Sequence, residues 1–163
     1  MELTVRAMRS ADLPAVLAIY ADGIEAGGAT LTAEPPTPAA WEAAHLPACR
    51  LVAESSGTVA GFVALTPFSS RSVYNGVAEL SVYVAARFRG QGVGRALIAA
   101  LIAESEQSGF WTLLAKVLSG NRASLRLLEA CGFRAVGVHE HLGRDRDGRW
   151  QDIVLLERRS GLR

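Results

Sequence analysis

The sequence has few cysteines, no long apolar run and almost no surplus charge. Two cysteines in 163 residues, Cys49 and Cys131, are too few for a disulfide framework and indicate a reducing compartment. No apolar stretch approaches the ~20 residues that span a bilayer, and the first residues lack a signal-peptide pattern. With 17 Lys and Arg against 16 Asp and Glu, a net charge of +1 does not favour binding to nucleic acid or to a membrane surface. We therefore expect a cytoplasmic protein.

The length predicts one domain over residues 1–163, without an internal repeat or a low-complexity tract. A chain of this size buries roughly 70% of the surface that its unfolded form exposes. A sizeable core is therefore available without a second domain.

The stretch from Glu79 to Leu101 reads as a strand that runs into a helix through a basic, glycine-rich turn. Its first part alternates apolar with other residues, and its last part consists of strong helix formers. Between them, glycines let successive N–H groups converge on an anion at the positive end of the helix. These glycines are Gly90, Gly92 and Gly94, and the positive charges around them are Arg87, Arg89 and Arg95. The turn predicts a pyrophosphate site.

The spacing of the glycines excludes two common nucleotide sites. A dinucleotide fingerprint that starts at Gly90 needs its third glycine where the chain has Arg95. A P-loop needs Gly-Lys followed by Ser or Thr, which the sequence lacks. Without further evidence, the turn also fits a glycine-rich surface loop that binds no ligand, with its arginines exposed to solvent.

The rest of the chain alternates predicted strands and helices. Strands are expected over residues 3–7, 50–54, 58–65, 80–84, 112–117, 134–141 and 150–157, and helices over 13–20, 41–46, 94–101 and 121–130. Ser10 and Asp12 are expected to cap the first helix, and residues 23–38 to be irregular. The order β-α-α-β-β-β-α-β-α-β-β predicts an α/β fold of the α+β type, in which helices flank a twisted mixed sheet.

Three features together resemble the GNAT superfamily of N-acetyltransferases over nearly the whole chain. They are the order of elements, the loop from Arg89 to Gly94, which matches Gln/Arg-x-x-Gly-x-Gly/Ala, and Asn121-x-x-Ser124 followed by Cys131-Gly132-Phe133. The resemblance implies the GNAT acyl-CoA N-acyltransferase fold, with acetyl-CoA as co-substrate.

Five further segments narrow the resemblance. They are Thr32-Ala-Glu34-Pro35, Trp41, Leu51-Val-Ala-Glu54, Ala78-Glu79 with Ser81-Val-Tyr-Val84, and Gly148-Arg-Trp150-Gln-Asp152. These segments resemble the phosphinothricin N-acetyltransferase family, which includes enzymes acting on methionine sulfoximine and arsinothricin. The loop from Ser69 to Tyr74 is more similar to the arsinothricin-acetylating members, and Ser69 replaces a lysine of some phosphinothricin enzymes. The resemblance implies acetylation of the α-amino group of a glutamate analogue, which confers resistance to it.

The central strand carries the expected chemistry. Glu79 opens it where the thioester is expected, and the resemblance places the catalytic glutamate there, as the base that accepts the ammonium proton. A strand edge exposes backbone donors, so the amides of Val82, Tyr83 and Val84 are expected to contact the acetyl carbonyl and the pantetheine arm. The Tyr83 phenol is a second catalytic candidate. The other expected cofactor-binding residues are Arg89, Gly90, Gln91, Gly92, Val93, Gly94, Arg95, Asn121 and Ser124.

The expected substrate ligands are Arg71, Tyr74, Glu79 and Thr32. Arg71 presents a planar fork that binds carboxylate, phosphinate or arsenical oxygens through paired hydrogen bonds.

The identity of the general acid, the group that protonates the leaving thiolate, stays open. Many GNAT members carry Tyr, and the phosphinothricin enzymes His, seven residues after the asparagine, where this chain has Leu128. Leucine cannot donate a proton. Tyr83 or water must then protonate the thiolate, or the thiolate leaves unassisted.

Other chemistries are disfavoured. His139 and His141 lie two apart on a predicted strand, but no third ligand accompanies them, so no metal is expected. The segment from Asp145 to Gly148 is too short for a calcium loop. Cys131 follows a helix C-terminus, which disfavours a thiolate, so direct transfer in a ternary complex is preferred to an acyl-cysteine route.

Two other functions remain open. A GNAT enzyme that acetylates another amine or a protein N-terminus would need an open peptide groove. A non-catalytic acyl-CoA-binding sensory domain would bind CoA without turnover; Leu128 favours this alternative and Glu79 opposes it. The resemblance also implies a homodimer, with residues 143–150 as a candidate to close the partner's site.

Overall fold

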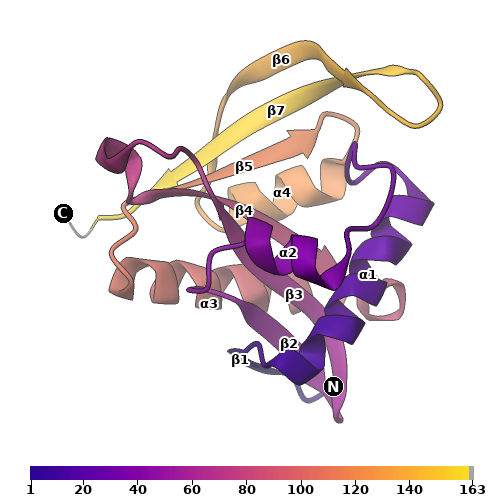
Figure 1. Cartoon of the computed structure of the whole chain (residues 1–163), viewed down its shortest axis with the longest axis vertical. Coiled ribbons are helices and arrows are strands. Elements are labelled where there is room, and N and C mark those ends of the chain that lie inside the picture. The colour runs from indigo at the N-terminus through magenta and orange to yellow at the C-terminus, as the bar shows by residue number, and fades with distance from the viewer. Residues whose placement is uncertain (162–163) are drawn as a thin grey trace.

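The computed structural model describes residues 1–161, in which seven strands and four α-helices follow the predicted order (Figure 1). The strands are β1 (Thr4–Ala7), β2 (Leu51–Ser55), β3 (Thr58–Pro67), β4 (Val77–Val84), β5 (Thr112–Leu118), β6 (Arg134–Arg144) and β7 (Trp150–Arg159). The α-helices are α1 (Leu13–Ala26), α2 (Pro38–Ala44), α3 (Val93–Gln107) and α4 (Arg122–Ala130). Short 3-10 turns are η1 (Ser10–Asp12), η2 (Ser72–Tyr74) and η3 (Ala86–Phe88). None of the helices within residues 1–161 combines the length and the apolar character needed to cross a membrane.

The strands form one mixed sheet in the order β1-β2-β3-β4-β5-β7-β6. All neighbouring pairs are antiparallel except β4 and β5, which are parallel. A parallel pair needs a crossover connection, which α3 supplies. The predicted mixed α/β sheet is thus confirmed.

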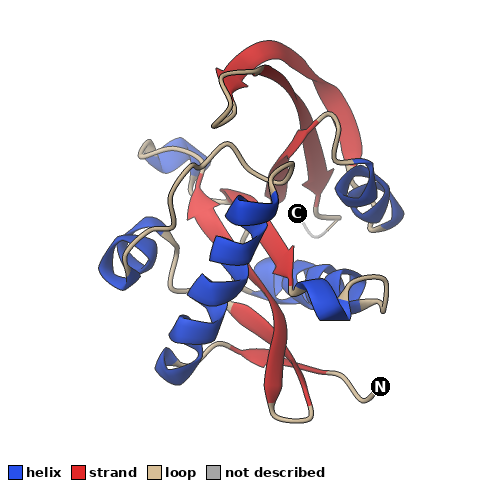
Figure 2. Ribbon diagram, turned by 90° about the vertical axis from the view of Figure 1, so that its right-hand side faces the viewer, coloured by secondary structure: helices blue, strands red, loops and turns tan. Residues whose placement is uncertain are grey.

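Helices cover both faces of the sheet (Figures 1 and 2). Leu97, Leu101 and Leu128 belong to the larger core cluster, which packs α3 and α4 against one face. Trp41 and Phe62 belong to a smaller cluster that packs α1 and α2 against the other. Full burial of a large apolar side chain contributes roughly 1.5–3 kcal/mol, so these clusters hold the helices against the two faces of the sheet.

The helix α1 is longer than predicted. Residues 23–38 were expected to be irregular, and this is wrong for Gly23 to Ala26, which continue α1, and for Pro38, which begins α2. The helix expected over 41–46 thus begins three residues earlier and ends at Ala44. Helix α1 tolerates Gly23 because the Tyr83 ring packs there: a Cβ at this position would lie 3.1 Å from the ring. Helix α1 ends at Gly27, whose φ of 74° stops the regular backbone.

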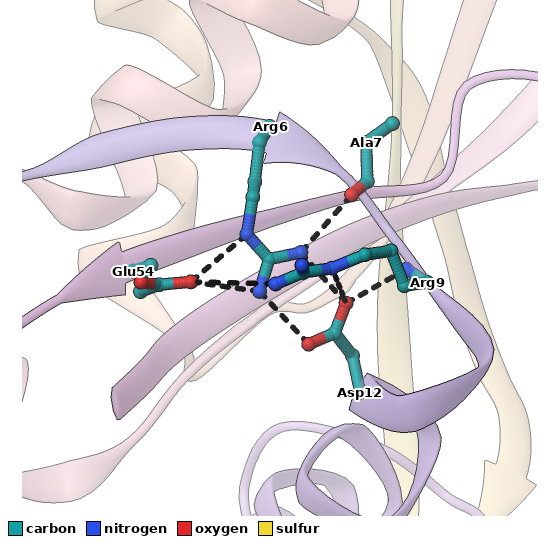
Figure 3. Close-up of polar contacts among 5 residues, drawn as sticks. All are labelled: Arg6, Ala7, Arg9, Asp12 and Glu54. Atoms are coloured by element: carbon teal, nitrogen blue, oxygen red, sulfur yellow. Dashed lines mark hydrogen bonds and ion pairs between the residues drawn. The ribbon is translucent and has the colours of Figure 1, made fainter. Parts of the chain in front are cut away.

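The start of α1 is anchored by an ion-pair cluster instead of a simple cap. The Asp12 carboxylate accepts hydrogen bonds from the Arg6 guanidinium at 2.7 and 2.9 Å and from the Arg9 N–H at 2.7 Å (Figure 3). Arg6 also donates to Glu54 on β2 at 2.9 Å. Only 8% of the Asp12 side chain is exposed, and these contacts lower its pKa to about 2, the Arg6 hydrogen bond most of all. The cluster joins β1, β2 and η1.

The hairpin of β6 and β7 forms the far edge of the sheet and arches over the molecule (Figure 2). Its register shifts between His139 and Gly143, and His141 has a φ of 48°. His139 and His141 were expected two residues apart on one strand, and the shift interrupts the regular alternation of side chains between them. Within residues 1–161, no three His, Cys, Asp or Glu side chains gather as a metal site would require.

Candidate active site

The central feature of the site is the separation of β4 from β5. The two strands pair from Val77 with Thr112 to Glu79 with Leu114 and no further. Beyond that point β4 stays paired with β3 and β5 with β7. The diverging strands open a cavity of about 900 Å³ that passes from one face of the sheet to the other. It is lined by all five residues from Leu80 to Val84.

The alternation of β4 gives the cavity two distinct sides. Val82 and Val84 pack toward α3 with the larger core, whereas Tyr83 packs toward α1 with the smaller one. Because side chains alternate across a sheet, Glu79 and Ser81 share the face of Tyr83. The cavity thus joins a side bounded by α3 and α4 to a side bounded by α1.

On the α3 side, the glycine-rich turn adopts the backbone that its sequence predicts. Gly90 and Gly92 have φ values of 71° and 83°, and Gly92 is the N-cap of α3. The N–H groups at this helix start face the cavity end that Arg89 and Arg95 also line. Gly94 allows a close helix contact, since a Cβ there would lie 2.8 Å from Leu127. The dipole of α3, the N–H groups of its first turn, which have no partner within the helix, and the guanidinium groups of Arg89 and Arg95 together suit the pyrophosphate of coenzyme A.

The α4 side adds Asn121 and Ser124. The Asn121 side chain accepts the Ser124 N–H at 3.3 Å and caps α4, as predicted, and both residues line the cavity. Leu128, also on this wall, is 1% exposed and belongs to the core. At this position, where the resemblance led us to expect Tyr or His, the chain thus has a side chain that cannot donate a proton.

On the α1 side, Tyr83 is held by aromatic packing. Its ring stacks on Phe62 at 5.6 Å between centroids and meets Tyr20 at 4.9 Å. Burial raises the pKa of Tyr83 to about 12, and the nearby Tyr20 adds to the rise, while a hydrogen bond with Thr30 opposes it. The phenol is thus protonated at neutral pH.

Glu79 lies at the point where the strands part, and it is the only acid among the described residues that line the cavity. Its Oε1 is 3.4 Å from Nζ of Lys116 on β5. Lys116 lies two residues beyond Leu114, the partner of Glu79, so the two side chains share one face of the sheet. Sequence analysis missed Lys116. The available signal was a lone charge inside the apolar strand from Leu113 to Leu118.

The loop after α1 and the β6–β7 hairpin close the α1 side of the cavity. Leu31 packs so tightly on Gly143 that a Cβ there would lie 2.6 Å from its Cδ1. Leu142 and Ile153 of the hairpin line the cavity. Arg146 at the hairpin tip donates to the Glu25 carbonyl at 2.6 Å. Gly143, the first residue of the segment expected to close a partner's site, thus contacts Leu31 of its own chain, while none of residues 143–150 lines the cavity. Local sequence patterns do not reveal this contact.

Most predicted site residues line this cavity, and three do not. Thr32, Glu79 and the predicted cofactor residues other than Gln91 are among its lining residues. The Gln91 side chain donates instead to the Arg87 carbonyl at 3.0 Å. Arg71 and Tyr74 lie outside the lining, where the guanidinium sits 5.7 Å from the Tyr74 ring centre. Arg71 therefore reaches this cavity only if its loop moves or a second copy brings it.

Comparison with known proteins identifies the family. The profile of the acetyltransferase (GNAT) family matches residues 16–133. A phosphinothricin N-acetyltransferase of Alcaligenes faecalis is 43% identical over 95% of this chain and 81% of its own. An L-methionine sulfoximine/L-methionine sulfone acetyltransferase of Pseudomonas paraeruginosa is 31% identical over 96% of this chain and 94% of its own.

Among solved structures, a GNAT superfamily phosphinothricin acetyltransferase from Sinorhizobium meliloti, in complex with acetyl-CoA, superposes with a TM-score of 0.89. It is 28% identical and the match covers 99% of this chain and 90% of the other. The fold, the parted strands and the sequence matches agree. The protein belongs to the GNAT family and is an acetyltransferase.

Proposed function

We propose that the protein transfers the acetyl group of acetyl-CoA to the α-amino group of a small glutamate-like amino acid of the phosphinothricin, arsinothricin or methionine sulfoximine type. The observation that carries the proposal is Glu79, the single cavity-lining acid in residues 1–161, placed where β4 and β5 part. Two relatives, a phosphinothricin N-acetyltransferase and an L-methionine sulfoximine/L-methionine sulfone acetyltransferase, support the substrate class.

Glu79 acts as the general base. An amino acid enters as an ammonium ion, whose nitrogen has no lone pair for attack on a thioester until one proton leaves. The Glu79 side chain is 30% exposed, so it reaches the cavity and stays in contact with water. It accepts the proton directly or through one water molecule.

The backbone of β4 positions the reacting carbonyl. Residues 80–84 continue for about 17 Å beyond the last β5 pair at 3.3 Å per residue, and they line the cavity. The Ala85 N–H donates to the Ala60 carbonyl, and Tyr83 pairs with Phe62 in the same antiparallel register, so the backbone groups of Tyr83 face β3. The backbone groups of Val82 and Val84 face the other side, where they have no β5 partner. N–H groups of this kind, fixed before the reaction, stabilise the charge that develops on the carbonyl oxygen.

Tyr83 is better suited to hydrogen-bond the leaving thiolate than to protonate it. Its pKa of about 12 lies roughly 3.5 units above that of a thiol, about 8.5. Full proton transfer from Tyr83 to the thiolate would thus cost about 5 kcal/mol. The phenol donates a hydrogen bond, and water supplies the proton.

We also propose direct transfer within a ternary complex. Neither free cysteine lines the cavity, and burial raises the pKa of both the Cys49 and the Cys131 thiols. A thiol with a raised pKa is a poor candidate for an acyl-enzyme nucleophile. Intersecting initial-velocity lines are the expected pattern, whereas parallel lines would point to an acyl-enzyme.

The oligomeric state and the cellular location of the protein belong to the same proposal. We propose one domain that acts as a homodimer in the cytoplasm, where acetylation gives resistance to a toxic amino acid. The exposed side chains of Val136, Val138 and Trp150 on the β6–β7 hairpin, 46–56% accessible, support a second copy packing there. Light scattering on the purified protein distinguishes a dimer from a monomer.

The test of the function is thiol release from acetyl-CoA with phosphinothricin, arsinothricin, methionine sulfoximine and glutamate. Turnover on at least one analogue, with the N-acetyl product identified by mass spectrometry, is the expected result. Tight binding of acetyl-CoA without turnover on any amine would instead support the sensory domain.

A further inference from the structure

Lys116 is the only lysine in the sequence; the other sixteen of its 17 basic side chains are arginines. It lies on β5, with 53% of its side chain exposed, and its Nζ is 3.4 Å from Glu79 Oε1. Both residues line the cavity on the side bounded by α1. An acid and a lysine of opposite charge thus sit together at the expected acceptor end.

The other cations of the cavity serve its opposite end. Among the described lining residues, only Arg89, Arg95 and Lys116 carry a positive charge. Arg89 and Arg95 flank the glycine turn at the start of α3, the end of the cavity where the pyrophosphate is expected, and the Arg89 Nε also donates to the Val84 carbonyl at 3.4 Å. Arg71 is not among the lining residues. Among the residues of one chain that the structure describes, Lys116 is therefore the cavity-lining cation available to an anionic group of the acceptor.

We propose that Lys116 binds the α-carboxylate of the amino-acid substrate, an inference that rests on the proposed function. The ammonium and carboxylate of an α-amino acid are separated by one carbon, so they match two adjacent protein charges of opposite sign. The ammonium takes the place of Lys116 beside Glu79, and the released lysine pairs with the carboxylate. Lys116 thus selects zwitterionic acceptors and orients the amine toward its base.

A lysine suits this exchange better than an arginine. A guanidinium grips a carboxylate through two parallel hydrogen bonds, whereas an ammonium is a point charge on a flexible stem. The Glu79–Lys116 pair makes one contact and is open to solvent. Such ion pairs contribute little net free energy, in the range of about 0–1 kcal/mol. Parting them to admit a substrate therefore costs little.

The test compares Lys116→Met and Lys116→Arg with native protein on two acceptors, L-methionine sulfone and its carboxamide. Both have an α-amine and a neutral side chain, but only the first has a carboxylate. Lys116→Met is expected to raise the KM for the sulfone about 10-fold or more and that for the carboxamide less than 2-fold. Lys116→Arg is expected to recover most of the loss. Arg134→Met, which removes the cation of the Glu157 pair outside the cavity, is the matched control.

Equal effects of Lys116→Met on both acceptors would overturn the proposal, because the lysine would then act only through Glu79. An unchanged KM for the sulfone would overturn it as well. Calorimetric binding of the sulfone to the CoA-loaded protein separates this inference from the proposed function. Binding that weakens about 10-fold in Lys116→Met supports the carboxylate contact even if no acceptor is turned over. Failure of the native protein to bind the sulfone contradicts it.

Discussion

Glu79 on β4 and Leu114 on β5 form the last pair of the parallel ladder, and the two strands part beyond them. This one relationship opens the cavity, leaves the backbone from residue 80 to 84 without a β5 partner, and places the acid at the fork. Lys116 lies two residues beyond Leu114 on β5, so its side chain is on the same face of the sheet as Glu79 and contacts it. The site is thus a consequence of sheet geometry.

The glycine turn gives a first prediction. Gly92→Ala is expected to weaken acetyl-CoA binding at least several-fold, because Gly92 has a φ of 83°, where a side chain costs about 1–2 kcal/mol. A Cβ there would meet nothing within 4 Å, so backbone strain, not crowding, is the cause. Calorimetry measures the affinity.

The matched control is Gly57→Ala, in the β2–β3 turn. Gly57 has a φ of 77° and equally open surroundings, so it imposes a similar strain far from the cavity. Its acetyl-CoA affinity is expected to stay native. Equal losses of affinity in the two variants would show that the turn matters only for general stability.

Tyr83 gives a second prediction. Tyr83→Phe is expected to lower kcat by no more than about 10-fold, because the phenol contributes one hydrogen bond and no proton transfer. Spectrophotometric titration of the native protein should show one tyrosine that ionises near pH 12. A loss beyond 100-fold, with the fold intact by circular dichroism, would make Tyr83 the missing acid.

The ion-pair cluster at β1 gives a third prediction, on stability. The pKa of Asp12 is lowered to about 2 from 3.8, so the stabilisation is present above pH 4 and is lost as the pH falls toward 2. Asp12→Asn should therefore reduce the free energy of unfolding by about 2 kcal/mol at pH 7. The gap between variant and native protein should nearly close at pH 2. Urea denaturation at both values checks this, and a gap that persists at pH 2 would contradict the electrostatic cause.

Much of the fold follows from local pattern. Period-two alternation, helical spacing and turn glycines predicted every strand and helix, since these signals come from neighbours in the chain. Element ends were less accurate: α3 continues to Gln107 and α1 to Ala26. The last turn of α1 was expected to be irregular, because Tyr83, which packs against Gly23, is sixty residues away in sequence and no local pattern shows it.

The sequence predicted the part of the candidate site whose residues are close together in the chain. The strand that begins at Glu79, the glycine cradle and the Asn121 cap needed only β4, the start of α3 and the start of α4. Lys116 was missed because its contact with Glu79 depends on strand register. The contact of Leu31 with Gly143 was missed for a similar reason, since a loop meets a distant hairpin.

Arg71 gives a fourth prediction. Arg71→Ala is expected to raise the KM for the amino acid about 10-fold, because a bidentate contact with an anionic group would be lost. Since Arg71 lies outside the cavity lining, this effect requires its loop to move or a second copy to supply it. Steady-state kinetics on phosphinothricin provide the measurement. An unchanged KM would remove Arg71 from the site and leave Lys116 as the acceptor cation.

The most direct test of the account is the turnover of Glu79→Gln, measured beside its affinity for acetyl-CoA. Glutamine keeps the shape of the side chain but cannot accept the ammonium proton. We expect kcat at neutral pH to fall by about 10²–10⁴-fold, while calorimetry finds the acetyl-CoA Kd within about 2-fold of native. Native turnover in this variant would show that the acid at the β4–β5 fork is not the base of the reaction.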